Sequence, residues 1–191
     1  MARGRTGQRQ DTAARLVAAA AKEFNKHGFD GTDSNKIARR AGFAPQTFYR
    51  WFRNKTDVFI AVYRAWEDEE ERVLGGLLAR GAPMIELVEA IIDQVRAHRL
   101  LRRSLRQLAL DDTAVRKARA ESRRRQIEQT QRWAGPEARS APEIAALLLQ
   151  FDRLCDAIAD RELADFGIDE ATAQQAMLDI LRQMRRHQEP V

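Results

Sequence analysis

Apolar residues recur every three or four positions along most of the chain, the spacing that places them on one face of an α-helix. Glycine and proline interrupt this pattern at a few points and divide the chain into segments. These segments predict helices near residues 11–26, 33–41, 45–52, 55–71, 84–97, 100–110, 113–133, 144–158 and 169–184. We therefore expect an all-α protein.

Residues 32–57 contain two short predicted helices in close succession, which is the pattern of a helix-turn-helix with a third helix after it. Thr32 is a good N-cap for the first helix, and Gly42 suits the left-handed residue that follows a helix. Pro45 is tolerated only in the first turn of a helix, so the second helix is predicted to begin there.

The second short helix has the outer side chains that a DNA-reading helix needs. Phe48 and Phe52 face inward, whereas hydrogen-bonding, aromatic and cationic residues lie outward. Such side chains reach base edges in the major groove and hold phosphates. A helical hairpin with merely solvated cations is the alternative, but it does not explain why so short a helix exposes these residues together. The predicted DNA-binding residues are Thr32, Ser34, Pro45, Gln46, Thr47, Tyr49, Arg50 and Lys55, the last exposed at the start of the next helix.

Positive charge is concentrated around the predicted helix-turn-helix. Residues 1–56 carry twelve Lys and Arg against four Asp and Glu, and residues 96–125 carry eleven against three, so each has a net charge of +8. Residues 57–95 (three against nine) and 126–191 (seven against twelve) have net charges of −6 and −5. The first basic segment fits phosphate binding with counterion release. The second, Arg96 to Arg125, can pair with the acidic run at 67–71, form a solvated face or bind an anionic effector.

Four segments follow one another in the first third of the chain: LVAAAAKEF, HGFDGT, IARRAGFAPQTFYRWF and NKTDVF. In their order and spacing they resemble the N-terminal domain of the TetR family of bacterial transcriptional regulators. Ser34, Ala44, Gln46 and Trp51 differ from the residues usual at these positions in the family. The resemblance implies a DNA-binding domain, dimerisation through the last two helices as a four-helix bundle, and a small-molecule effector that releases the operator.

We expect three parts along the chain. Residues 1–10 have no apolar periodicity and are predicted to form a flexible basic arm. Residues 11–56 are predicted to form the helix-turn-helix DNA-binding domain, and residues 57–191 a helical effector-binding and dimerisation domain.

The two C-terminal helices carry wide apolar faces, more than a single partner would cover. One short recognition helix binds DNA weakly, and a symmetric dimer places two of them about 34–36 Å apart on a pseudo-palindrome. We therefore expect a homodimer, although the same faces can also serve as the core of one chain. The predicted interface residues are Ile144, Leu148, Phe151, Cys155, Met177, Ile180, Leu181 and Met184.

The middle helices are expected to enclose the effector pocket that the resemblance implies. Each candidate residue can equally be plain core. The candidates are Trp66, Met84, Val88, Ile92, Leu105, Leu108, Trp133 and Phe151.

The sequence favours no catalytic, cofactor or metal chemistry. The three histidines are scattered, the single cysteine excludes an internal disulfide, and no nucleophile with a base or phosphate-binding glycine loop stands out. No apolar run is long enough for a membrane span, so we expect a cytoplasmic protein with double-stranded DNA, a second copy of itself and an unidentified effector as partners. The expected function is a dimeric, effector-released repressor. The alternative is a helical small-molecule-binding protein that binds DNA only nonspecifically.

Overall fold

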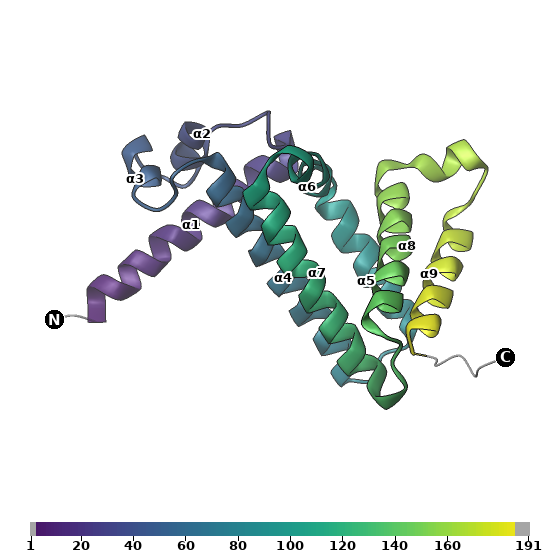
Figure 1. The fold of residues 1–191 in the computed structure, drawn as a ribbon. Helices are drawn as coiled ribbons and strands as arrows, with labels where there is room; N and C mark the ends of the chain where they lie inside the picture. The colour runs from purple at the N-terminus through teal and green to yellow at the C-terminus, as the bar shows by residue number, and fades with distance from the viewer. Residues whose placement is uncertain (1–2, 186–191) are drawn as a thin grey trace. The chain divides into compact units, whose positions relative to one another are not determined.

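The computed structural model describes the backbone of residues 3–185 and the side chains of residues 11–185 except that of residue 137. All the regular structure in this described part is helical, which confirms the all-α prediction (Figure 1). The elements are α1 Arg3–His27, α2 Ser34–Arg40, α3 Pro45–Tyr49, α4 Lys55–Ala79, α5 Met84–Ala97, α6 Arg99–Asp111, α7 Thr113–Ala134, η1 Gly135–Glu137, α8 Ala141–Asp160, η2 Glu162–Phe166 and α9 Glu170–Arg185.

The helices form two compact units. The first comprises the chain up to Glu69 together with Leu100–Arg116, and the second comprises Glu70–Arg99 together with the chain from Lys117 onward. The first unit therefore extends beyond the boundary that we expected at residue 56. A domain of fewer than fifty residues buries little apolar surface, and the first half of α4 and most of α6 complete its core.

The core of the first unit is built around aromatic rings from α1, the loop after it and α4. Phe24 and Phe59 are fully buried with ring centroids 5.2 Å apart, and Phe29 lies 5.3 Å from Phe59. Ile37 and Phe48 attach α2 and α3 to the same core. The predicted inward face of the second short helix is thus confirmed at Phe48, with Phe52 partly buried beside it.

Two helix boundaries differ from the sequence pattern. α1 begins at Arg3, so residues 3–10 are helical where a flexible arm was expected, while the first two residues lie outside the described part. Five of these eight residues are arginine or glutamine, which are good helix formers, and they extend a helix that is already anchored in a core. α4 runs through Gly75 and Gly76, where a break was expected, because glycine within a helix costs only about 1 kcal/mol.

The second unit is organised by α5, α8 and α9, which pack on one another. Figure 1 shows α8 and α9 side by side in yellow-green and yellow. Their shared core contains Val88, Phe151 and Met177.

The residues predicted to form a dimer interface lie inside this single chain. Ile144, Phe151, Cys155, Met177, Ile180, Leu181 and Met184 are buried, and Leu148 is partly buried. The apolar stripes of α8 and α9 face one another and α5, so within this chain these side chains form the core of the second unit, which is the alternative that the sequence left open. Separately, none of the described helices combines the length and apolar character that a bilayer span requires.

We predict that Phe59→Ala lowers the free energy of unfolding by about 3–5 kcal/mol, because it removes a fully buried ring that contacts two others. Urea unfolding followed by circular dichroism measures this value. Leu110→Ala is the matched control, because Leu110 belongs to the same unit but is 69% exposed. Its effect should stay within about 0.5 kcal/mol. Equal effects of both substitutions would contradict the assigned core.

Candidate nucleic-acid interface

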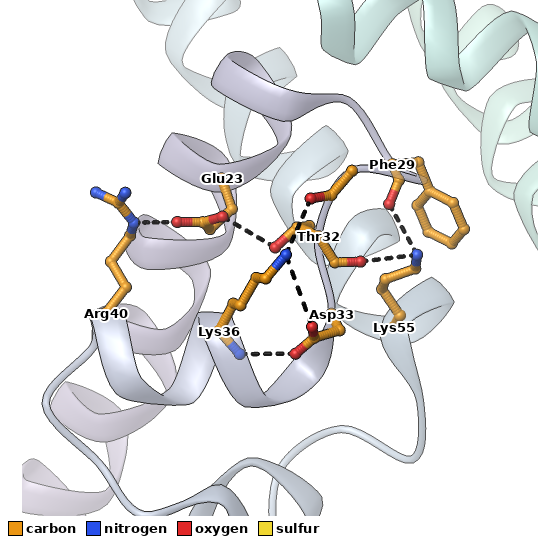
Figure 2. A network of polar contacts seen from close by, with 8 residues as sticks. Glu23, Phe29, Thr32, Asp33, Lys36, Arg40 and Lys55 are labelled. Atoms are coloured by element: carbon orange, nitrogen blue, oxygen red, sulfur yellow. Dashed lines mark hydrogen bonds and ion pairs between the residues drawn. The ribbon is translucent and has the colours of Figure 1, made fainter.

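The start of α2 is capped by Asp33. The Asp33 carboxylate accepts a hydrogen bond from the Lys36 backbone N–H at 2.8 Å, which lowers the pKa of Asp33 (Figure 2). Thr32, predicted to be the cap and a DNA contact, is only 4% exposed, and its Oγ1 donates to Glu23 Oε2 at 2.9 Å. The N-cap prediction for Thr32 is therefore wrong, because a buried carboxylate on α1 takes its hydroxyl; its contact with DNA stays a prediction.

Glu23 is the buried acid that ties α1 to both ends of α2. It accepts hydrogen bonds from the Thr32 hydroxyl just before α2 and from Arg40 Nε at the end of α2 (Figure 2). Burial by itself would raise the pKa of Glu23, but the bonds from Arg40 and Thr32 outweigh it and the pKa is lowered. Glu23 was not among the residues predicted from the sequence. Its signal was an acid at a position that continues the apolar spacing of Leu16 and Ala20.

Lys55 closes the loop between α1 and α2 from the other side. Its Nζ donates to the backbone carbonyls of Phe29 at 2.7 Å and Thr32 at 3.0 Å, and lies 4.0 Å from the centroid of the Phe29 ring (Figure 2). Burial lowers the pKa of Lys55, while Asp30 and Asp33 oppose that shift. Lys55 was predicted to be exposed, and this is wrong because its ammonium satisfies carbonyls that have no helical partner.

The turn between α2 and α3 is fixed by a second cation. Arg15 of α1 donates from Nη2 to the Ala41 carbonyl at 2.9 Å, and its guanidinium lies 4.5 Å from the centroid of the Phe43 ring. Gly42 has φ +79, the left-handed conformation that the sequence predicted there. Arg15 thus joins α1 to the end of α2, and nothing in the local pattern identified it.

α3 presents most of the predicted DNA-binding residues on an exposed surface. Pro45, Gln46, Tyr49 and Arg50 are exposed, and Thr47 is partly buried. The helix ends at Tyr49, with the following residue as its C-cap, and is therefore shorter than predicted.

Ser34, at the first position of α2, is joined to this surface. Its Oγ lies 2.7 Å from the Tyr49 hydroxyl, a hydrogen bond in which either atom can donate. The structure therefore brings together six of the eight predicted DNA-binding residues and directs Thr32 and Lys55 into the scaffold beneath them.

The next helix begins beside this surface with its own cap. Asn54 Oδ1 accepts from the Asp57 N–H at 2.9 Å, and the exposed Arg53 donates to the Asp57 carboxylate at 2.7 Å and 3.0 Å. The hydrogen bonds from Arg53 lower the pKa of the Asp57 carboxyl. Arg53 is thus held by a carboxylate at the rim of the surface.

The predicted effector-pocket residues are divided between two cores. Trp66 and Leu105 are buried in the first unit with Leu108 packed against them. Val88, Ile92 and Phe151 are buried in the second unit, and Met84 and Trp133 pack against that core.

The second basic segment has partners of several kinds. Arg96 pairs with Glu170, Arg123 pairs with Asp152, and Arg116 Nε donates to the Ala109 carbonyl at 2.9 Å. The partners of these three arginines lie outside residues 67–71, and pairing of other arginines of the segment with that acidic run stays a prediction. Within the described residues, no group of three or more His, Cys, Asp and Glu is placed to hold a metal ion.

We predict that Lys55→Met lowers the free energy of unfolding by about 1–3 kcal/mol, because two loop carbonyls lose their hydrogen-bond donor. Urea unfolding measures the change. Lys22→Met, an exposed lysine on α1, is the control and should change stability by less than about 0.5 kcal/mol. Unchanged stability of Lys55→Met, with weakened DNA binding, would instead favour the phosphate contact that the sequence suggested.

Comparison with known proteins agrees with this geometry. Residues 16–62 match the family described as bacterial regulatory proteins, tetR family. Over 64 residues the chain is 31% identical to the uncharacterized HTH-type transcriptional regulator YdgC of Bacillus subtilis (strain 168), a match covering 34% of this chain and 33% of that protein. The match thus spans about a third of the length of that curated relative.

Solved structures extend the likeness of the fold to nearly the whole chain. A transcriptional regulator from Rhodococcus sp. Rha1 superimposes with a TM-score of 0.68 at 18% identity, covering 90% of this chain and 95% of that one. A TetR family transcription regulator from Marinobacter aquaeolei VT8 gives a TM-score of 0.54 at 19% identity, covering 94% and 96%. Residues 16–62 thus match the N-terminal part of the bacterial regulatory proteins of the tetR family, and the fold of nearly the whole chain is similar to that of solved transcriptional regulators.

Proposed function

We propose that the protein binds a pseudo-palindromic DNA operator as a homodimer and is released from it by a small-molecule effector. The main support for DNA binding is the set of side chains exposed at and beside α3. Gln46 on α3 and Arg50 at its C-cap are exposed together, and Phe48 anchors the helix in the core. Amide and guanidinium groups form paired hydrogen bonds with base edges, so these two side chains are suited to sequence readout.

Charge supports the same assignment. The first 56 residues have twelve Lys and Arg against four Asp and Glu. Lys55 and Arg15 donate to backbone carbonyls, whereas Arg50 lies on the exposed surface beside α3. An excess of cations in this segment attracts phosphates and makes binding depend on salt.

The homodimer is proposed because α3 has only five residues and can contact few bases. The second unit leaves large apolar side chains exposed at its surface: Leu149 on α8 at 65%, Phe166 at the end of η2 at 71%, and Ile168 at 40%. We propose that a second copy covers these residues, in place of the buried ones named from the sequence.

The effector is proposed to bind within the second unit. Val88, Ile92 and Phe151 offer apolar contacts there, with Met84 and Trp133 beside them. A ligand that prefers a dimer geometry unsuited to the operator would lower DNA affinity by its difference in affinity for the two states.

The alternative function, a small-molecule-binding protein with only nonspecific DNA binding, is favoured by one feature of α3. Its N-cap, Ala44, makes no side-chain hydrogen bond, so the helix lacks a common source of rigidity. Nonspecific binding would keep the salt dependence and lose any preferred sequence.

We expect selection from random DNA, at near-physiological salt, to yield two half-sites related by a pseudo-two-fold axis. Gln46→Ala and Arg50→Ala should each relax the preference at one base position, by about 1–3 kcal/mol of discrimination. Arg124→Ala, an exposed arginine on α7, is the control and should leave the recovered site unchanged. Recovery of no common sequence by the wild type would support the alternative function instead.

We also predict that Leu149→Glu combined with Phe166→Glu raises the dimer dissociation constant at least about tenfold, because a carboxylate is costly to bury at an interface. Sedimentation equilibrium measures the constant. Leu110→Glu places the same charge at an exposed leucine of the first unit and should leave it unchanged. A dimer that withstands the double substitution would place the interface elsewhere.

A further inference from the structure

The hydroxyls of Ser34 and Tyr49 form a hydrogen bond across the helix-turn-helix. Ser34 is the first residue of α2, Tyr49 is the last residue of α3, and their oxygens are 2.7 Å apart. Tyr49 is 57% exposed, so the bond lies at the surface that α3 presents. A hydrogen bond this exposed to water contributes little to the free energy of folding. Because it lies on the candidate DNA surface, we ask whether it acts in DNA binding.

α3 is a very short helix that packs against α2. Its five residues make less than two helical turns, its N-cap Ala44 has no side-chain bond, and Phe48 anchors its buried side. The Tyr49 ring packs edge-on against Phe48, with centroids 5.3 Å apart and an interplanar angle of 78°. The phenol oxygen is thus held at two points, by the ring contact below and by Ser34 beside it.

A pair of hydroxyls contains two hydrogens, and only one is used between them. If Ser34 donates to the phenol oxygen, the phenol hydrogen stays available for another acceptor. Accepting one hydrogen bond also strengthens a hydroxyl as a donor. Phosphate oxygens are the acceptors that hydroxyl side chains of DNA-binding proteins most often meet, and they fix the protein's position on the duplex.

We propose that Ser34 is a positioning residue for DNA binding: its hydroxyl donates to Tyr49 and directs the phenol O–H toward a phosphate oxygen of the operator. This inference rests on the proposed function. Sequence readout stays with the base-facing residues of α3, so losing Ser34 should weaken binding to all sequences alike.

The first measurement uses the DNA-free protein. The chain has two tyrosines, Tyr49 and Tyr63, and their ¹³Cζ resonances report the hydrogen bonding of each phenol. Tyr49→Phe assigns the signals. We expect Ser34→Ala to shift the Tyr49 resonance and Ser34→Thr to restore it. An unchanged resonance in Ser34→Ala would overturn the proposal, because the hydrogen bond would then be absent.

The second measurement is affinity for a selected operator and for an unrelated duplex. We expect Ser34→Ala and Tyr49→Phe each to weaken both by about tenfold, the double variant to lose no more than either single one, and Ser34→Thr to recover. Thr113→Ala is the matched control: Thr113 is also the first residue of its helix, after Asp112, whose carboxylate accepts from two backbone N–H groups. It should bind as the wild type does.

Three results would overturn the positioning role. Ser34→Ala could bind normally while Tyr49→Phe weakens, the two losses could add, or Ser34→Ala could alter the preferred base. Urea unfolding of each variant shows whether a loss reflects misfolding instead. Failure of the wild type to bind any DNA would remove the proposed function and this role together, and the resonance measurement would still show whether the hydroxyl bond exists.

Discussion

Backbone carbonyls on either side of α2 must be satisfied before the helix-turn-helix can hold its shape, and two cations satisfy them. Lys55 donates to the carbonyls of Phe29 and Thr32 before α2, and Arg15 donates to the Ala41 carbonyl after it. Each cation also lies over an aromatic ring, which adds attraction and shields the bond from water. Because an unpaired carbonyl is costly to bury, the position of α2 depends on these contacts more than on its own seven residues.

The position of α3 depends on these contacts around α2. A helix of five residues is too short to be stable alone, so its direction comes from Phe48 in the core and from the turn at Gly42. Glu23 completes the support, since its buried carboxylate joins α1 to both ends of α2 through Thr32 and Arg40. The polar groups beneath the surface thus support it, while Gln46 and Arg50 upon it stay exposed.

In the second unit, too, some side chains are buried and others are exposed, but here both kinds are apolar. α8 and α9 turn their stripes toward each other and α5, so the residues most easily identified from periodicity are those least accessible to a partner. Leu149 and Phe166 lie off that stripe and remain exposed. An apolar helix face indicates that another surface buries it, and another helix of the same chain is the most immediate candidate.

The sequence by itself determined the all-α class, the helix-turn-helix, Gly42 as the left-handed residue after α2, and the inward Phe48, because each follows from spacing or backbone preference within a few residues. Only the tertiary structure decided that Thr32 faces Glu23 nine residues away, that Lys55 is half-buried against carbonyls 26 and 23 residues away, and that the stripes of α8 and α9 are core. Local periodicity fixes which side of a helix is apolar. The partner of a polar or apolar group is fixed by elements distant in sequence, which no local pattern records.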